Sequence, residues 1–139
     1  MIVLDTNVVS ESVKPLPAAG VLAWVDDHFD VLGVTSITVG ELLVGVQIMP
    51  AGHRRDQLAE ALETSFLRLM PCLDYDEAAA RAYAKMREIA QRVGRGLSPE
   101  DGMIAAICVA RGATLATRNV KDFDFLPVDI VNPWELAGT

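Results

Sequence analysis

The sequence predicts an α/β fold, because short apolar segments typical of buried strands alternate along the chain with longer segments typical of helices. The chain has 139 residues, of which 51% are hydrophobic, and this length suits one domain with its own core. It contains no internal repeat, low-complexity tract or linker. We therefore expect residues 1–139 to form a single α/β domain.

Apolar runs and proline breaks define the first elements. An apolar run at residues 2–4 predicts the first strand. Pro15 and Pro17 interrupt the chain before a helix that we expect at about residues 18–27. Apolar residues return at 31–34 and are followed by polar side chains, which predicts the second strand.

Two helices are expected next. The segment at about residues 36–48 is helix-like and nearly all apolar, and Pro50 and Gly52 end it. The segment at about 54–69 carries apolar residues at helical spacing, namely Leu58, Leu62, Phe66 and Leu69. A short strand is predicted to follow at residues 70–73.

The second half of the chain begins with its clearest helical pattern, at about residues 76–93. The apolar face of this helix is expected to consist of Ala78, Ala82, Met86, Ile89 and Val93. The remaining expected elements are a helix at about 99–111, strands at 114–117 and 129–131, and a helical turn from Pro133.

Basic side chains lie roughly opposite that apolar face, at Arg81, Lys85, Arg92 and Arg95. Such a row could follow a phosphate backbone. However, Glu77 and Glu88 precede Arg81 and Arg92 by four residues, a spacing that favours ion pairs on a helix surface. We therefore predict a solvated, salt-bridged face.

The composition limits the classes of function. With 12 Lys and Arg against 19 Asp and Glu, the net charge is −7, whereas a general nucleic-acid binder is basic. Four acids gathered at a metal site would account for much of that excess. Cys72 and Cys108 form no C-x-x-C pair, and His28 and His53 lack ligand spacing, which argues against zinc sites and thiol catalysis.

Neither a membrane segment nor a signal peptide is evident. No apolar run approaches the 18 or so residues that span a bilayer, and no basic segment precedes the apolar N-terminus. We therefore expect a cytoplasmic protein without a membrane partner.

Asp5 directly follows the first predicted strand, in the tripeptide Asp5-Thr6-Asn7. An acid at this place can simply cap a following helical turn. In open α/β sheets, however, ligands bind beyond the carboxyl ends of the strands, and Asp5 lies at such an end. Asp5 is therefore a candidate site residue as well as a candidate cap.

Glu41 stands nearly alone as a polar residue in an apolar helix. It shares a helical stripe with Ile37, Val44 and Ile48. If that stripe is buried, an ionised carboxylate there costs several kcal/mol unless a cation, hydrogen bonds or water compensate it. We therefore favour a metal-binding or catalytic role over an acid that reaches solvent at the edge of the apolar face.

Asp101 fits a helix-capping pattern, with Ser98 at the N-cap position, Pro99 at N1 and Asp101 at N3. A carboxylate in the first turn also interacts favourably with the helix dipole. Yet Asp101 shares its stripe with Ile104 and Cys108, which we expect to face the core. An acid that only caps a helix can face water, so Asp101 is also a candidate site residue.

Asp122 follows the strand expected at 114–117, within the segment TRNVKDFDF. A turn or cap explains an aspartate there about as well as a function does. Asp124 is a competing candidate two residues further on.

Topology can bring these acids together. If the strands are parallel, Asp5, Glu41, Asp101 and Asp122 all reach the carboxyl edge of the sheet. Carboxylates in one cleft repel one another unless cations lie between them, and oxygen-rich sites suit Mg²⁺ or Mn²⁺. Such metals can activate water and polarise a phosphoryl group, so phosphodiester hydrolysis is the chemistry that this arrangement predicts.

Four sequence features in this order resemble one known family. They are DTN after the first strand, a lone Glu in an apolar helix, SPEDGMIAAICVARGATLATRN, and NVKDF. Together they resemble the PIN-domain toxins of bacterial toxin–antitoxin pairs, the VapC-like and FitB-like ribonucleases, over essentially the whole chain. The resemblance implies a three-layer α/β/α sandwich with a mostly parallel sheet, a Mg²⁺ or Mn²⁺ cofactor, RNA as substrate, a homodimer, and inhibition by a small antitoxin protein.

The resemblance also implies roles for particular residues. The acidic quartet that holds metal and acts in catalysis falls on Asp5, Glu41, Asp101 and Asp122. Small polar residues that help to hold metal or water fall on Asn7, Thr117 and Asn119.

Two other classes share parts of this pattern. A phosphatase with an aspartyl nucleophile also starts with a strand and an aspartate, but Asn7 stands where its D-x-D motif needs the second acid. A phospho-acceptor domain would match the late Lys121 but needs an early acid pair that the chain lacks. A non-nuclease metal-binding or phospho-acceptor α/β domain is therefore the alternative reading.

Overall fold

The structure is a computed structural model that describes residues 1–137, and a parallel sheet lies at its centre. Within these residues, five strands are hydrogen-bonded in the order β3-β2-β1-β4-β5, and every pairing is parallel. The strands are β1 (Ile2–Leu4), β2 (Leu32–Thr35), β3 (Cys72–Leu73), β4 (Thr114–Ala116) and β5 (Ile130–Val131). Because all of them run the same way, their carboxyl ends share one edge of the sheet, as expected.

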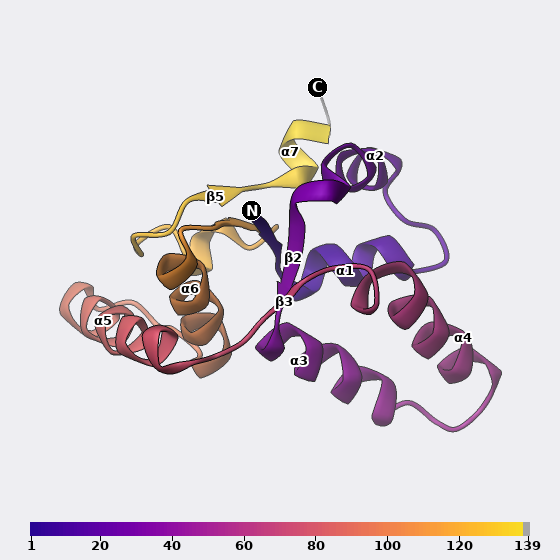
Figure 1. Cartoon of the computed structure of the whole chain (residues 1–139), viewed down its shortest axis with the longest axis horizontal. Coiled ribbons are helices and arrows are strands. Elements are labelled where there is room, and N and C mark those ends of the chain that lie inside the picture. Colours follow the sequence, from indigo (N-terminus) through magenta and orange to yellow (C-terminus); the bar gives the residue numbers. More distant parts are fainter. Residues whose placement is uncertain (138–139) are drawn as a thin grey trace.

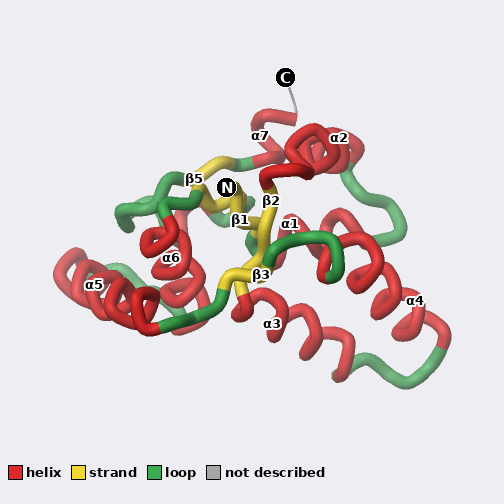
Figure 2. Tube along the Cα trace, viewed as in Figure 1, coloured by secondary structure: helices red, strands yellow, loops and turns green. Residues whose placement is uncertain are grey.

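Helices connect the strands and cover both faces of the sheet, which confirms the predicted three-layer sandwich. They are α1 (Thr6–Val13), α2 (Ala19–His28), α3 (Ser36–Gln47), α4 (His53–Leu62), α5 (Glu77–Val93), α6 (Pro99–Arg111) and α7 (Pro133–Ala137). Figure 1 shows α5 and α6 on one side of the sheet and α1 to α4 on the other, and Figure 2 shows the strands between these two layers. No helix within residues 1–137 is both long enough and apolar enough to cross a membrane.

Two hydrophobic clusters hold the layers together, one on each face of the sheet. Successive residues of β1 point to opposite faces, so Leu4 joins the cluster with α1, α2, α3 and α4, while Val3 joins the cluster with α5 and α6. Ala116 and Leu115 in β4 divide between the clusters in the same way. The central strands are therefore buried on both faces, as parallel strands usually are.

Cap residues at both ends define α5 and α6, and Ser98 was predicted among them. The side chains of Asp76 and Ser98 accept hydrogen bonds from backbone N–H groups in the first turns of these helices. Gly94 and Gly112 end them in the left-handed conformation, at φ values of 71° and 63°, which favours glycine. The bounds of α6 match the predicted helix at residues 99–111.

The outer face of α5 is salt-bridged, as predicted. Arg81 pairs with Glu77 at 3.1 Å, and Arg92 pairs with Glu88 at 3.0 Å. The predicted buried face of this helix was partly wrong. Met86 is buried as expected, but Ala79 and Ala90 are buried in place of Ala78 and Val93, which are exposed.

The structure differs from the prediction most clearly at α1 and after α4. Residues 6–13 form a full helix where only a capped turn was considered, and Val8 and Val9 anchor it in the core. The helix expected at 54–69 ends at Leu62 and continues as a wider π-helical segment, Glu63–Leu67. Helical spacing does not persist through that segment, so Leu69 is exposed and does not join the stripe.

Candidate active site

Asp5 lies at the carboxyl end of β1 and is fixed at both of its carboxylate oxygens. Its backbone N–H donates to the carbonyl oxygen of Ala116 at 2.9 Å, which continues the pairing of β1 with β4. Oδ1 accepts from the backbone N–H of Thr6 at 2.8 Å, while Oδ2 accepts from Thr117 Oγ1 at 2.8 Å and Asn7 Nδ2 at 3.3 Å. Asp5 is only 5% exposed. It is therefore a cap of α1 and a rigidly oriented carboxylate.

A polar network around Asp5 joins the start of α1 to the loop after β4. The buried Thr117 Oγ1 also accepts from Asn7 Nδ2 at 3.2 Å and from the backbone N–H of Asn119 at 3.1 Å. Asn7 Oδ1 accepts from the backbone N–H of Arg118 at 3.1 Å. The structure thus brings Asn7 and Thr117 to Asp5, whereas Asn119 takes part through its backbone and its residue is exposed.

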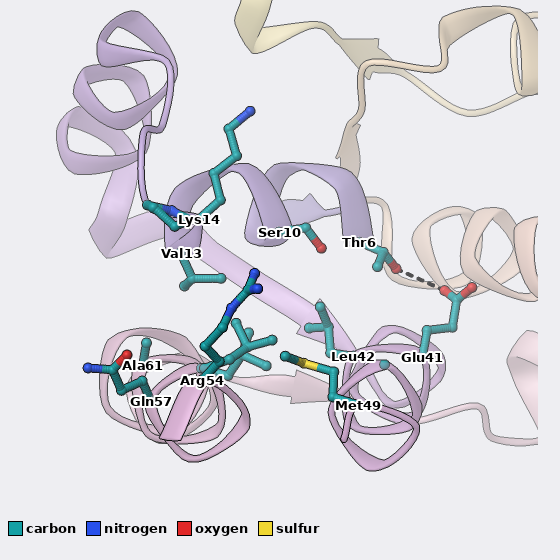
Figure 3. A pocket seen from close by; sticks show the side chains of 14 residues that line it. Thr6, Ser10, Val13, Lys14, Glu41, Leu42, Met49, Arg54, Gln57 and Ala61 are labelled. Carbon is teal, nitrogen blue, oxygen red and sulfur yellow. Dashed lines mark hydrogen bonds between the residues drawn. The ribbon is translucent and has the colours of Figure 1, made fainter. Parts of the chain in front are cut away.

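Glu41 reaches the same site from α3. Thr6 Oγ1 donates a hydrogen bond of 2.9 Å to Glu41 Oε1, as Figure 3 shows. Although the residue as a whole is exposed, partial burial of its carboxyl group raises the pKa of Glu41, and the charge of Asp5 raises it further. Thr6 is a site residue that sequence reasoning treated only as a possible cap, although its place beside Asp5 in the DTN motif was available as a signal.

Glu41 does not lie on a buried stripe of α3, contrary to the prediction. The stripe it shares with Val44 and Ile48 is open, since these two residues are 59% and 78% exposed. Leu42 and Val46, each 6% exposed, bury the other face of α3 in the core. The helix is apolar on two faces and packs with only one, so its composition resembled that of a fully buried helix.

Asp101 lies half-buried in the first turn of α6. Ser98 Oγ accepts the backbone N–H of Asp101 at 3.1 Å, so Ser98 caps the helix, as expected. Ile104 and Cys108 on the same stripe have no exposed surface, which confirms that this side of α6 faces the core. The stripe therefore directs the Asp101 carboxylate inward.

Asp122 and Asp124 lie in different surroundings. Asp122 ends a short 3₁₀ turn, Val120–Asp122, after β4, and the fully buried Phe123 anchors that turn in the core. Asp124 forms an ion pair of 3.3 Å with Arg95. The charge of Asp122 raises the pKa values of Asp5 and Asp101.

The four acids form one electrostatic cluster. Burial raises the pKa of Asp101 to about 6, and the negative charges of Asp5, Asp122 and Glu41 contribute to the rise. Burial also raises the pKa of Asp5 against the effect of its hydrogen bonds, and Asp122 adds to that rise. Asp101 is thus the acid whose pKa responds to all three of the others.

The carboxylate oxygens of this cluster suit a divalent ion that prefers oxygen ligands. Within residues 1–137, no three carboxylate, imidazole or thiol groups converge closely enough to hold one ion by themselves. Mg²⁺ is usually bound by one or two carboxylates and keeps several waters. Carboxylates that repel one another are suited to such an ion, because its positive charge relieves the repulsion. One of these carboxylates, Asp5, is already fixed in orientation.

A parallel sheet between two helical layers, with carboxylates at its carboxyl edge, places this protein among the α/β domains that have an acidic site at the strand ends. The chain belongs to the PIN domain family, whose family model matches residues 2–127.

Similar proteins extend over the whole chain. It is 43% identical over 140 residues to VapC ribonuclease Y4jK of Sinorhizobium fredii, covering 99% of this chain and 100% of that protein. It is 39% identical to Toxin FitB of Neisseria gonorrhoeae over 137 residues, covering 96% and 99% of the two chains. The crystal structure of FitAcB from Neisseria gonorrhoeae matches with a TM-score of 0.89 at 39% identity, over 96% of this chain and 99% of that one.

Proposed function

We propose that this chain is a divalent-metal-dependent endoribonuclease that acts as the toxin of a toxin–antitoxin pair. The observation that carries the proposal is the placement of Asp5, Glu41, Asp101 and Asp122 on elements at the carboxyl edge of the sheet, where Thr6 contacts both Asp5 and Glu41. The pKa values of Asp5 and Asp101 also respond to neighbouring acids of this set. The similarity to a VapC ribonuclease and to Toxin FitB supports RNA as the substrate class.

In this proposal Asp5, Glu41, Asp101 and Asp122 surround Mg²⁺ or Mn²⁺, with one or two of them as direct ligands and the others acting through its bound waters. When bound, such an ion supplies Lewis acidity toward water and toward the phosphoryl group. Asp5 contributes the most rigid ligand, since both of its oxygens are hydrogen-bonded. Asn7 and Thr117 orient Asp5, as outer-shell partners orient ligands in many metal sites, and Asn119 supports Thr117.

The direct test is cleavage of RNA by the purified chain. We expect total cellular RNA to be cut in Mg²⁺ or Mn²⁺, cutting to stop in excess chelator, and activity to return when metal is restored. In cells, expression of the chain alone is expected to slow growth, and co-expression of its cognate antitoxin to restore it. Failure of the folded protein to cut RNA with either metal, or equal cutting in chelator, would count against the proposal.

A groove beside the acids supports the antitoxin part of the proposal. It has a volume of about 760 Å³ and lies between α1, α3 and α4, with Thr6 and Glu41 at one end (Figure 3). Its apolar lining includes Val13, Leu42, Met49, Leu58 and Leu62. We infer that it receives an apolar helical segment of the antitoxin, with a cation of that segment directed toward Glu41.

Filling the groove should release the enzyme from its antitoxin. Gly45 lines the groove and has nothing within 4 Å of an added Cβ, so Gly45→Leu begins a side chain in the groove from an open position. We expect about tenfold weaker antitoxin binding, measured by titration, with RNA cleavage retained. Gly40→Leu is the matched control, because it makes the same change in the same helix at an equally open position outside the groove. Equal antitoxin binding by both variants would contradict this placement.

The open face of α3 supports a homodimer. Val44 and Ile48 are large apolar residues on this face, and Leu43 beside them is 38% exposed. We propose that a second copy of the chain covers this face, since contiguous exposed apolar residues are typical of interfaces.

A charge in that face should weaken the dimer. Ile48→Asp is expected to raise the dimer dissociation constant about tenfold, measured by sedimentation equilibrium, because association would bury an unpaired carboxylate. Ile48 is largely exposed in the single chain, so the melting temperature of the monomer should change little. Leu16→Asp, at another highly exposed apolar residue, serves as the control. A dimer that Ile48→Asp leaves unchanged would place the interface elsewhere.

A further inference from the structure

A second, smaller hollow lies beside Asp122. We propose that it is the subsite for the nucleotide next to the scissile phosphodiester, with Arg118 and Lys121 as substrate-binding residues. The proposal rests on the proposed ribonuclease function. The hollow has a volume of about 420 Å³, a size suited to a small ligand, and its polar lining residues are Arg118, Asn119, Lys121, Asp122, Asn132 and Glu135.

The acid cluster lies between two hollows of different character. Asp122 belongs both to the cluster and to the lining of the polar hollow, and Glu41 belongs both to the cluster and to the apolar groove. A substrate that reaches the acids can extend into either hollow. The groove is lined mostly by apolar side chains, although it also carries Lys14 and Arg54. In the second hollow every lining residue except Val120 is polar or charged, and such groups match a nucleotide.

The backbone holds Arg118 in a fixed relation to the site. Its N–H donates to Asn7 Oδ1 at 3.1 Å, and Asn7 in turn donates to Asp5 Oδ2. The preceding residue, Thr117, donates directly to Asp5 at 2.8 Å. Arg118 is therefore set next to the most rigid carboxylate of the site by contacts that do not involve its own side chain.

The Arg118 side chain rests on an aromatic ring. Its guanidinium carbon lies 5.0 Å from the centre of the Trp134 ring, and that ring packs against the hydrophobic cluster of the α1–α4 layer. The backbone N–H of Trp134 donates to Asn132 Oδ1 at 3.0 Å, which fixes the start of α7. A guanidinium held on one face by tryptophan can stack a nucleobase on its other face.

Arg118 and Lys121 are cations without an acidic partner in a chain of net charge −7. Six of the twelve basic residues form ion pairs with acids within residues 1–137, and Arg118 and Lys121 are among the six that do not. Arg118 acts on Glu11 at longer range, but the direct partner of Glu11 is Lys14 at 2.8 Å. The positive charge beside Asp122 is therefore available to a phosphate group of the substrate.

The acids in the hollow favour a nucleotide over a small anion. Asp122 and Glu135 would repel a free phosphate or sulfate that approached the two cations. A nucleotide brings a phosphate for the cations together with base N–H donors for carboxylate and amide oxygens. Because the base must leave its helical stack to lie on Arg118, the matching substrate is single-stranded RNA.

The test is single-turnover cleavage of a labelled single-stranded RNA in Mn²⁺ across a range of protein concentrations, which separates the half-saturating concentration from the maximal rate. Arg118→Ala is expected to raise the half-saturating concentration about tenfold and Lys121→Ala about threefold, with maximal rates near that of wild type. The salt dependence of binding should become shallower by about 0.7 in the log–log slope for each lost phosphate contact. Arg118→Lys keeps the charge and loses the stacking plane, so we expect an intermediate value.

Arg81→Ala is the control, because it removes the same charge from the exposed face of α5. The subsite is overturned if Arg118→Ala and Lys121→Ala raise the half-saturating concentration no more than Arg81→Ala does, while wild type cuts the RNA normally. The stacking contact is overturned if Arg118→Lys matches wild type. If wild type neither cuts nor binds the RNA, the ribonuclease proposal has failed and the subsite fails with it. Thermal unfolding of each variant confirms that it is folded.

Discussion

Asp5→Asn is expected to reduce RNA cleavage by about 100-fold or more, measured as the single-turnover rate at saturating protein. The substitution keeps the shape of the side chain but removes the negative charge of the most rigid carboxylate in the cluster. The affinity for metal should fall, and a bound ion should be positioned less accurately.

The fold should tolerate this substitution. Asp5 is buried, so removing its charge relieves a desolvation cost. The substitution can also remove the oxygen that accepts a hydrogen bond from Asn7 Nδ2, and this loss lowers the stability of the fold. We therefore expect a circular dichroism spectrum like that of wild type and a small change in melting temperature.

Asp124→Asn provides the matched control for activity. It makes the same charge change in the loop that carries Asp122, but its carboxylate pairs with Arg95 at the surface. A surface ion pair contributes little to stability, so we expect cleavage within about twofold of wild type. If Asp5→Asn cuts as fast as Asp124→Asn, the acid cluster is not the catalytic site.

The arrangement of the sheet could be predicted because it depends on local patterns. Apolar strands that alternate with helices favour parallel pairing, and parallel pairing places every strand end at one edge. In this topology Asp5 and Asp122 lie toward the same edge of the sheet, since each follows a strand directly or within a short loop. Asp101 was placed by a capping pattern together with a core-facing stripe, and both are present in the structure.

Features that depend on tertiary packing could not be predicted in the same way. The helix α1 begins with β-branched residues of modest helix propensity, and it is stabilised by the Asp5 cap and the burial of Val8 and Val9. The predicted burial of Glu41 was wrong. The sequence of a helix that is apolar on two faces does not show which of the two faces stays open. The contact between Arg118 and Trp134 joins residues of separate elements and leaves no spacing signal.

The metal-free protein should lose stability as the pH rises from about 4 to about 7. The pKa of Asp101 is about 6 in the folded chain, against an ordinary value of 3.8. Between these values the folded state holds a proton that the unfolded state has released, so the free energy of unfolding falls as pH rises, and the loss is complete above the folded pKa. The full shift corresponds to about 3 kcal/mol, and partial exposure of Asp101 to water reduces our expectation to about 1–2 kcal/mol.

Asp101→Asn should therefore raise the melting temperature of the metal-free protein by several degrees at pH 7.5 and by little at pH 4. Glu100→Gln is the control, because it makes the same charge change in the same helical turn at an exposed position. The helix dipole favours an acid at position 100, whereas the charge of Glu100 also raises the pKa of Glu41, so the two effects oppose each other and we expect little net change in stability.

Added metal should reduce the stability difference between wild type and Asp101→Asn at pH 7.5. An ion that binds only the folded chain stabilises wild type by about 1.4 kcal/mol when its free concentration is ten times the dissociation constant. Asp101→Asn has lost one anionic ligand and should gain less from the same Mn²⁺ concentration. The measurement is thermal unfolding of wild type, Asp101→Asn and Glu100→Gln at pH 4 and 7.5, each in chelator and in excess Mn²⁺. If Mn²⁺ shifts none of the melting temperatures, and Asp101→Asn unfolds below wild type in chelator at pH 7.5, Asp101 is only a residue of the helix terminus and the cluster does not bind metal.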